Sequence, residues 1–189
     1  MRLGKWLLAG ALLALALPAY ADNVLGNAGF ETGSLSPWVN SIDLCGGCTW
    51  SVTNTSSNTG TYSAVVEGNR LLAQSFTAVA TTDINSISLW LRMPGSGIAA
   101  IYFHYTDNST FEFLVNPTDT WTQFTVTGNL DLSKSLDGFG VYGCTGCGSQ
   151  TFADDFVVDA NTVPEPGSLA LLGTGLVSGA GLLRRRFTL

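Results

Sequence analysis

The chain has 189 residues, a formal net charge of −6 and only 12% charged residues. Residues 22–161, which remain when two atypical ends are set aside, hold three basic residues against thirteen acidic ones, a net charge of −10. A surface this acidic repels nucleic acid and anionic lipid, and it suits a cation or a neutral polysaccharide. About 140 residues are enough for one domain with its own core.

The first 21 residues have the three parts of a secretory signal peptide. Arg2 and Lys5 make a basic start, residues 6–17 are almost wholly apolar, and small residues precede a cleavage site after Ala21. A helix buried in the domain is the alternative, but nothing polar interrupts the apolar run. We therefore expect export, with Asp22 as the mature N-terminus.

Residues 22–161 contain short strand-like segments separated by turn residues about every ten positions, without a helical period. This pattern predicts an all-β fold, a sandwich or a barrel. Hairpins are expected across the "PGSG" turn at 94–97 and across the "TDNS" turn at 106–109. The expected strands are residues 50–53, 62–67, 71–77, 84–93, 98–105, 110–115, 123–127, 139–142 and 152–159.

Alternation along these strands separates core positions from outward ones. Ile87, Leu89 and Leu91, for example, are expected in the core. Sugars are bound by aromatic rings flanked by hydrogen-bonding side chains, and the outward positions supply both. The alternative is that these residues are scattered or covered by the opposite sheet. The predicted carbohydrate face consists of Trp90, Arg92, Tyr102, His104, Glu112 and Tyr142.

Catalysis has weaker support in the sequence. A glycosidase needs two carboxylates at a set distance, to which Glu67 or Glu112 could contribute. No nucleophile–base arrangement stands out, and the chain has a single histidine. We expect a non-catalytic protein. A structural matrix protein without a specific ligand and a small polysaccharide-degrading enzyme are the alternatives.

A run of motifs resembles the jelly-roll carbohydrate-binding modules with a galactose-binding-like fold, over most of residues 23–159. The motifs are "NVLGNAGFETGSLSPW" from Asn23, "TGTYSAVVEG", "LLAQSFTA", "ISLWLRM", "WTQFTVTG" and "FADDFVV". The resemblance implies a jelly-roll β-sandwich.

In that family the Gly-Phe-Glu segment, the loop before the "YSA" strand and a last-strand aspartate bind a structural Ca²⁺. Ca²⁺ prefers six to eight oxygen ligands, and it would relieve repulsion in a domain of charge −10. Asp155 is a possible substitute ligand, and the alternative is that Glu31 and Asp154 merely end strands. The implied ligands are carbonyls near Gly29 and Tyr62, Thr59, and the carboxylates of Glu31 and Asp154.

The four cysteines form two C-x-x-C pairs, Cys45 with Cys48 and Cys144 with Cys147. This spacing is typical of a four-cysteine zinc site, but an exported chain meets an oxidising compartment, which favours disulfides. Three disulfide connectivities are open. Both pairs lie in glycine-rich loops, which are expected to meet at one rim of the sandwich.

Residues 162–189 combine a Pro-Glu-Pro motif, a short apolar run over residues 168–183 and an arginine cluster. Sixteen residues of helix span about 24 Å, somewhat less than a bilayer core. Arginines stay on the cytoplasmic side, so we expect one transmembrane helix holding the exported domain at the inner membrane. The motif residues are Pro164, Glu165 and Pro166, and the cluster is Arg184, Arg185 and Arg186.

This tail resembles the PEP-CTERM sorting signal of Gram-negative bacteria. The resemblance implies an exosortase, a membrane cysteine transpeptidase that recognises and cuts the tail. It also implies delivery to the cell surface or to the exopolysaccharide matrix of a biofilm. The alternative is a plain C-terminal anchor that is never processed.

Overall fold

The computed structural model describes residues 22–95, 97–144 and 149–161. Residues 21–161 form one compact unit that contains both sheets, so this part of the chain has what an independently folding domain needs. Within the described ranges, no helix has the length and apolar character to cross a membrane. The expected signal peptide, transmembrane segment and sorting motif lie outside those ranges.

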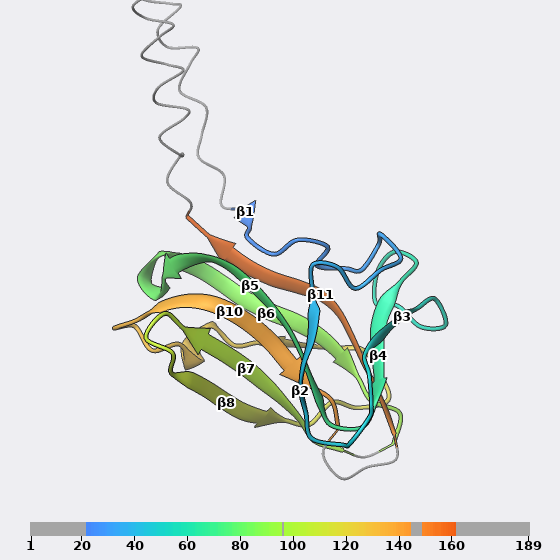
Figure 1. Cartoon of the computed structure of the whole chain (residues 1–189). Coiled ribbons are helices and arrows are strands. Elements are labelled where there is room, and N and C mark those ends of the chain that lie inside the picture. The colour runs from blue at the N-terminus through green and yellow to red at the C-terminus, as the bar shows by residue number, and fades with distance from the viewer. Residues whose placement is uncertain (1–21, 96, 145–148, 162–189) are drawn as a thin grey trace, which may run out of the picture. The chain divides into compact units, whose positions relative to one another are not determined.

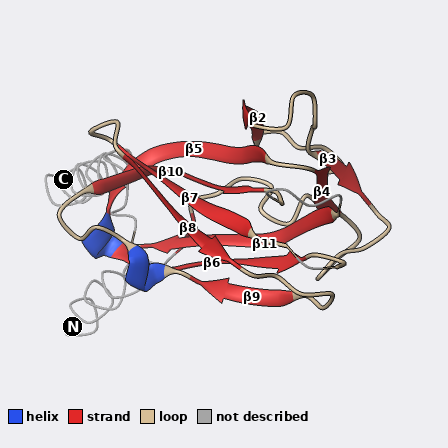
Figure 2. Cartoon of the chain, turned by 90° about the horizontal axis from the view of Figure 1, so that it is seen from below, coloured by secondary structure: helices blue, strands red, loops and turns tan. Residues whose placement is uncertain are grey.

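Two antiparallel sheets pack face to face (Figures 1 and 2). One sheet has the order β3-β4-β11-β6-β9, with β1 also paired to β11, and the other has the order β2-β5-β10-β7-β8. The strands are β1 (Asp22–Asn23), β2 (Val39–Asp43), β3 (Ser51–Thr53), β4 (Ser63–Glu67), β5 (Arg70–Ala80), β6 (Ile84–Arg92), β7 (Ala99–Tyr105), β8 (Thr110–Val115), β9 (Thr122–Thr125), β10 (Ser135–Tyr142) and β11 (Gln150–Ala160). Two 3-10 turns, η1 (Thr81–Asp83) and η2 (Thr127–Asn129), are the only helical turns in the described ranges.

The all-β sandwich and its nine expected strands are confirmed, with shifted ends. The first and last strands pair, with Asp22 opposite Ala160. The β7–β8 hairpin is also confirmed. The hairpin expected across residues 94–97 is wrong, because β6 and β7 belong to different sheets. Their apolar sides face each other across the core, so the connection crosses between layers.

The core centres on an aromatic cluster that ties both sheets to the connection between β1 and β2. The ring of Phe156 in β11 lies 4.4 Å from that of Trp38, 5.8 Å from that of Phe139 and 5.9 Å from that of Phe30. Phe30 and Trp38 belong to the β1–β2 connection, and all four side chains are buried. The core therefore fixes this connection against β11, where the last-strand aspartates follow one another.

The described parts of the two cysteine loops, up to residues 44–48 and 143–144, lie at one end of the sandwich. The N–H of Leu44 donates to the carbonyl of Asn69 (3.0 Å), and the N–H of Gly143 donates to that of Arg70 (3.1 Å), so both loops attach to the β4–β5 turn. Gly68 in that turn has φ +108°, and an added Cβ would lie 3.2–3.3 Å from the side chains of the first cysteine pair.

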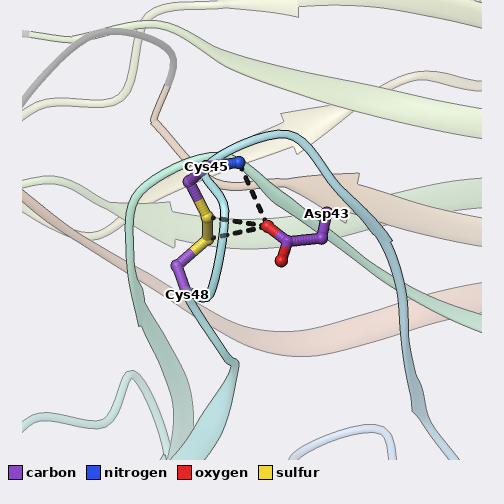
Figure 3. Close-up of side chains that lie close together, drawn as sticks. All are labelled: Asp43, Cys45 and Cys48. Carbon is purple, nitrogen blue, oxygen red and sulfur yellow. Dashed lines mark hydrogen bonds between the residues drawn. A yellow bond between two sulfur atoms is a disulfide. The ribbon is translucent and has the colours of Figure 1, made fainter.

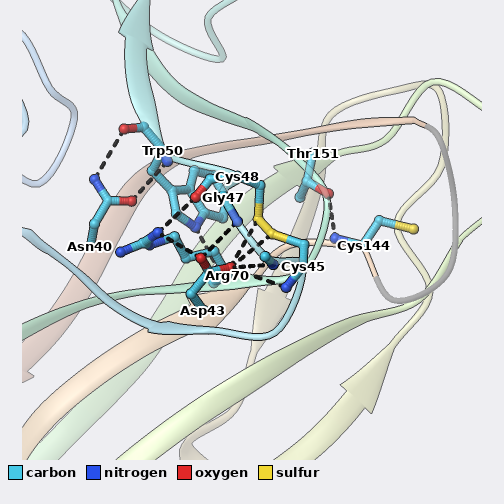
Figure 4. Close-up of a disulfide and its surroundings, with 10 residues drawn as sticks. Asn40, Asp43, Cys45, Gly47, Cys48, Trp50, Arg70, Cys144 and Thr151 are labelled. Atoms are coloured by element: carbon cyan, nitrogen blue, oxygen red, sulfur yellow. Dashed lines mark hydrogen bonds and ion pairs between the residues drawn. A yellow bond between two sulfur atoms is a disulfide. The ribbon is translucent and has the colours of Figure 1, made fainter.

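Cys45 and Cys48 form a disulfide (Figure 4). Cys144 is also disulfide-bonded, and its partner lies outside the described residues. The bond between Cys45 and Cys48 excludes the two crossed connectivities. A four-cysteine zinc site would need both of these sulfurs as thiolates.

Candidate functional site

The outer face of the five-stranded sheet carries a row of residues in register across all its strands. In this row small residues occupy β5 and β10, and longer side chains on β2, β7 and β8 flank them. The row through Gly138 repeats the arrangement, whereas in the remaining row Leu71 and Tyr142 occupy β5 and β10. The rows are Val39, Ala73, Gly140, Tyr102 and Glu112; Leu71, Tyr142, Ala100 and Leu114; and Ser75, Gly138, His104 and Thr110.

Where the rows through Gly138 and Gly140 cross β5 and β10, small residues leave a shallow trough, which Leu71 and Tyr142 border. Ala73, Gly138 and Gly140 keep the middle low, while Val39 and Leu114 stand 60% and 67% exposed at the edges. We call this face, defined by the residues of the three rows, the outer trough. Exposed apolar side chains beside a strip of small residues give a surface on which an extended chain can lie.

Tyr102 and Tyr142 pack edge to face in the outer trough, with ring centroids 6.2 Å apart. Both are buried against Leu71 and Ala100 in a small apolar cluster separate from the main core. Burial, followed by the nearby Glu112 carboxylate, raises the pKa of Tyr142 to about 12 and also raises that of Tyr102. Both hydroxyls therefore keep their protons at neutral pH, that of Tyr142 is hydrogen-bonded to Glu112, and both ring faces are largely covered.

A histidine–aspartate pair lies beside the tyrosines. His104 Nδ1 is 2.6 Å from Asp137 Oδ1. Asp137 was not predicted, because it sits at an irregularity of β10, between Leu136 and Gly138, where the pairing register shifts. The pair adds polar groups at one end of the trough.

The structure separates the predicted carbohydrate face into two. Tyr102, His104, Glu112 and Tyr142 lie together in the outer trough, but Trp90 and Arg92 lie on β6 in the other sheet, so the expectation of one shared face is wrong. Alternation gives a side chain's direction relative to its own strand and does not give the sheet to which the strand belongs. Glu67 and Glu112, each named as a possible contributor to a carboxylate pair, lie on different sheets.

A second cluster forms where β11 meets two loops. Asp154 is fully buried, and its carboxylate accepts N–H groups from Asn58 (2.8 Å), Asp155 (2.8 Å) and Thr59 (3.4 Å). The Asp155 carboxylate accepts the Thr59 hydroxyl and the Asn58 side-chain amide, each at 2.8 Å. Asp155 has φ +46° and lies at a shift in the pairing register of β11. Consecutive side chains of a regular strand point to opposite faces, but here the two aspartates contact the same loop.

The β1–β2 connection completes this cluster. Glu31 accepts the backbone N–H groups of Thr61 (3.0 Å) and Tyr62 (2.9 Å). A Cβ added to Gly29 would lie 3.2 Å from Asp155 Oδ1 and 3.6 Å from Asp154 Oδ1, so glycine allows the backbone to approach the carboxylates. The predicted ligands Gly29, Glu31, Thr59, Tyr62 and Asp154 are thus neighbours, together with Asp155.

The donor set of this cluster suits Ca²⁺, because it consists of carboxylate, hydroxyl and backbone oxygens. Desolvation raises the pKa of Asp154 to about 7, and the adjacent Asp155 carboxylate adds to the effect. No basic side chain of the described residues pairs with either aspartate. The oxygens of Glu31, Asp154 and Asp155 are not all within 4.8 Å of one another, so binding an ion through all three requires a side chain to move.

The one described group of three ligand-type side chains that does lie within 4.8 Å is Asp43, Cys45 and Cys48 (Figure 3). The Asp43 carboxylate accepts the N–H groups of Cys45 (3.1 Å), Gly46 (3.0 Å) and Gly47 (2.8 Å). These bonds, led by that from Cys45, lower the pKa of Asp43. Because the two sulfurs are bonded to each other, this group is a loop that is closed by a disulfide and by hydrogen bonds to Asp43.

Several solved structures share this fold. TmCBM61, solved in complex with β-1,4-galactotriose, matches with a TM-score of 0.53 and 21% identity over 72% of this chain and 97% of its own. The CBM22-1 xylan-binding domain of Paenibacillus barcinonensis Xyn10C matches with a TM-score of 0.51 and 14% identity, over 78% and 100%.

A third neighbour is the family 11 carbohydrate-binding module from Clostridium thermocellum, in complex with a β-1,3-1,4-mixed-linked tetrasaccharide. Its TM-score is 0.52, with 11% identity over 77% of this chain and all of its own. At such identities the likeness shows the fold alone, which is the jelly roll expected from the sequence.

No curated protein sequence matches the chain. A family model of the PEP-CTERM protein-sorting motif matches residues 162–186, the segment in which Pro164–Pro166 and Arg184–Arg186 were singled out. The chain therefore joins a jelly-roll sandwich of the carbohydrate-binding-module type to a PEP-CTERM sorting motif.

Proposed function

We propose that this protein is an exported, non-catalytic carbohydrate-binding protein of the cell surface or exopolysaccharide matrix. The observation that carries the proposal is the outer trough, where two registered rows place small residues beside exposed apolar and polar side chains. The carbohydrate-binding modules that share the fold and the sorting motif support it.

The trough suits a neutral, extended polysaccharide. Apolar Val39 and Leu114 contact the C–H surfaces of sugar rings, Glu112 accepts from sugar hydroxyl groups, and the Tyr142 hydroxyl, which donates to Glu112, offers its oxygen as an acceptor. The His104–Asp137 pair extends this polar edge. A charge of −10 on residues 22–161 selects against polyanions.

The sorting motif supplies the route of export. An exosortase recognises the motif at residues 162–186, while the apolar run at 168–183 holds the precursor in the inner membrane. Alanine at Pro164, Glu165 and Pro166 is expected to keep the protein with the inner-membrane fraction. Unchanged delivery of this variant to the surface would contradict the role of the motif.

Ca²⁺ belongs to the proposal as a structural ion. Glu31, Thr59, Asp154 and Asp155 would hold it together with carbonyls near Gly29 and Tyr62, which neutralises two adjacent carboxylates. When bound, the ion ties the β1–β2 and β3–β4 connections to β11. It supplies no reaction chemistry.

Isothermal titration of residues 22–161 with β-1,4-galactotriose, xylotetraose and a mixed-linkage tetrasaccharide tests the binding proposal. Ala73→Trp fills the middle of the outer trough and is expected to abolish binding there. Leu132→Ala, on an exposed loop residue outside the trough, is the matched control and should bind normally. Absence of binding to all three oligosaccharides and to the parent polysaccharides, or binding to the trough unchanged by Ala73→Trp, would contradict the proposal.

A further inference from the structure

The four tryptophans of the described residues divide into two kinds. Trp38 and Trp50 are buried, and each indole N–H donates to a backbone carbonyl, at 3.2 Å and 2.7 Å. Trp90 and Trp121 are half-buried, and within the described ranges neither indole N–H has a protein acceptor. An indole that offers ring surface and a free N–H to solvent has the polar and apolar parts that a ligand can use.

Trp90 and Trp121 share the outer face of the six-stranded sheet. Trp90 is in register with Gln123 of β9, Arg92 is in register with Phe152 of β11, and the Trp121 ring lies 6.4 Å from that of Phe152. We call Trp90, Arg92, Trp121, Gln123 and Phe152 the Trp90 patch. Diagonal neighbours on paired strands are roughly 7–8 Å apart, so one short stretch of ligand can contact both indoles.

Arg92 is held rigidly in the middle of the patch. Its guanidinium carbon lies 5.5 Å from the centre of the Phe152 ring, Nε donates to the carbonyl of Asp119 (2.7 Å), and Nη1 donates to Ser56 Oγ (2.9 Å). Of its five N–H donors, these bonds use two. Arg70 and Lys134 each have an acidic partner within 4 Å, whereas Arg92 has none among the described residues. The patch therefore presents fixed, uncommitted donors between two indoles.

The Trp90 patch and the outer trough point in opposite directions. In a sandwich the inner faces of the two sheets meet in the core, so their outer faces look away from each other (Figure 2). Leu89 and Leu91, which alternate with Trp90 along β6, are fully buried in that core. A ligand in the trough leaves the patch free.

We propose that the Trp90 patch is a second carbohydrate-binding surface, so that one copy of the domain bridges two chains of a neutral polysaccharide. The inference rests on the proposed function and extends it from attachment to cross-linking. The indoles contact sugar C–H surfaces, while Arg92 and Gln123 hydrogen-bond the hydroxyl groups. The charge of −10 on residues 22–161 again favours an uncharged polymer.

Binding stoichiometry gives the first test. Sedimentation first checks that residues 22–161 are monomeric, and the protein is then titrated with the same three oligosaccharides. We expect two sites per chain in the unchanged protein, and one site in the Trp90→Ala/Trp121→Ala variant and in Ala73→Trp. Loss of an indole contact is expected to weaken the patch roughly tenfold or more.

Bridging gives the second test. Beads carrying mixed-linkage β-1,3-1,4-glucan, xylan or β-1,4-galactan are mixed with the protein and the same polysaccharide in soluble, fluorescent form. Unchanged protein is expected to retain fluorescence on the beads. At a high excess of protein over polysaccharide less fluorescence should be retained, because separate copies of the protein then occupy the two chains. Trp90→Ala/Trp121→Ala should bind the beads but retain no fluorescence. Trp90→Phe/Trp121→Phe preserves the rings if the alanine variant fails to fold.

The outcomes separate the two proposals. Protein that binds the beads at one site and retains no soluble chain overturns bridging and leaves the proposed function intact. Bridging unaffected by both double variants, or loss of all binding in a Trp90→Ala/Trp121→Ala variant that is folded by circular dichroism, also overturns the two-surface arrangement. No binding of any kind by the unchanged protein overturns both proposals.

Discussion

Removal of Ca²⁺ is expected to lower the melting temperature of residues 22–161. At a free Ca²⁺ concentration of 100 times Kd, binding to the folded state alone contributes about 2.7 kcal/mol. An unfolding entropy of about 2.1 cal/mol/K per residue gives about 0.29 kcal/mol/K for 140 residues. The expected decrease on chelation is therefore about 9 °C.

Glu31→Gln isolates the contribution of the ion. Glutamine still accepts the N–H groups of Thr61 and Tyr62 through its carbonyl oxygen, so stability without Ca²⁺ should be nearly unchanged, whereas the Ca²⁺-dependent increase should shrink. Asp83→Asn removes an exposed carboxylate outside the cluster and is the matched control. Scanning calorimetry with Ca²⁺ and with chelator measures all three proteins. An equal Ca²⁺-dependent shift in Glu31→Gln, or no shift in the unchanged protein, would refute the assigned ligands.

Three further predictions concern stability. Phe156→Ala should cost about 3–5 kcal/mol in urea unfolding because its ring joins both sheets and the β1–β2 connection, and a loss under 1 kcal/mol would contradict this packing. Cys45→Ser/Cys48→Ser should cost about 2 kcal/mol, since the disulfide closes a very short loop; a much larger loss would show that it does more than close the loop. The Ser109 hydroxyl, followed by Lys134, holds the pKa of Asp107 well below its ordinary value, so this stabilisation is present above about pH 4 and is lost as the pH falls. Asp107→Asn should flatten the acid limb of the unfolding free energy, and an unchanged limb would contradict the assignment.

The sequence was sufficient for nine of the eleven strands and for the direction of their side chains. Leu89, Ile101 and Phe139 all lie in the core, as alternation predicts. The sequence did not show to which of the two sheets each strand belongs, because that depends on pairing between distant segments. Trp90 was therefore grouped with Tyr102, although their strands belong to opposite layers. β2, with little alternation in "VNSID", gave no strand signal.

The candidate sites show the same limit. Glu31 and Asp154 were recognisable from a motif resemblance, whereas the positive φ that brings Asp155 into the cluster depends on β11 pairing with its neighbours. Asp137 was missed for a similar reason, since it sits at a local shift in register. Trp121, in contrast, could have been found from the sequence. It directly precedes "TQFT", and side-chain alternation puts it on the face opposite to that of Phe124. Extending the expected strand by two residues would therefore have placed Trp121 on the outer face.

Amide and indole chemical shifts during titration with the mixed-linkage tetrasaccharide test carbohydrate binding most directly. We expect saturable shifts at the backbone amides of Ala73, Tyr102 and Gly140 in the outer trough, with separate shifts at the indole N–H groups of Trp90 and Trp121. Repeating the titration with β-1,4-galactotriose and xylotetraose covers the sugars carried or bound by the other structural neighbours. Spectra unchanged by all three sugars, or shifts confined to residues outside both surfaces, would contradict carbohydrate binding at these surfaces.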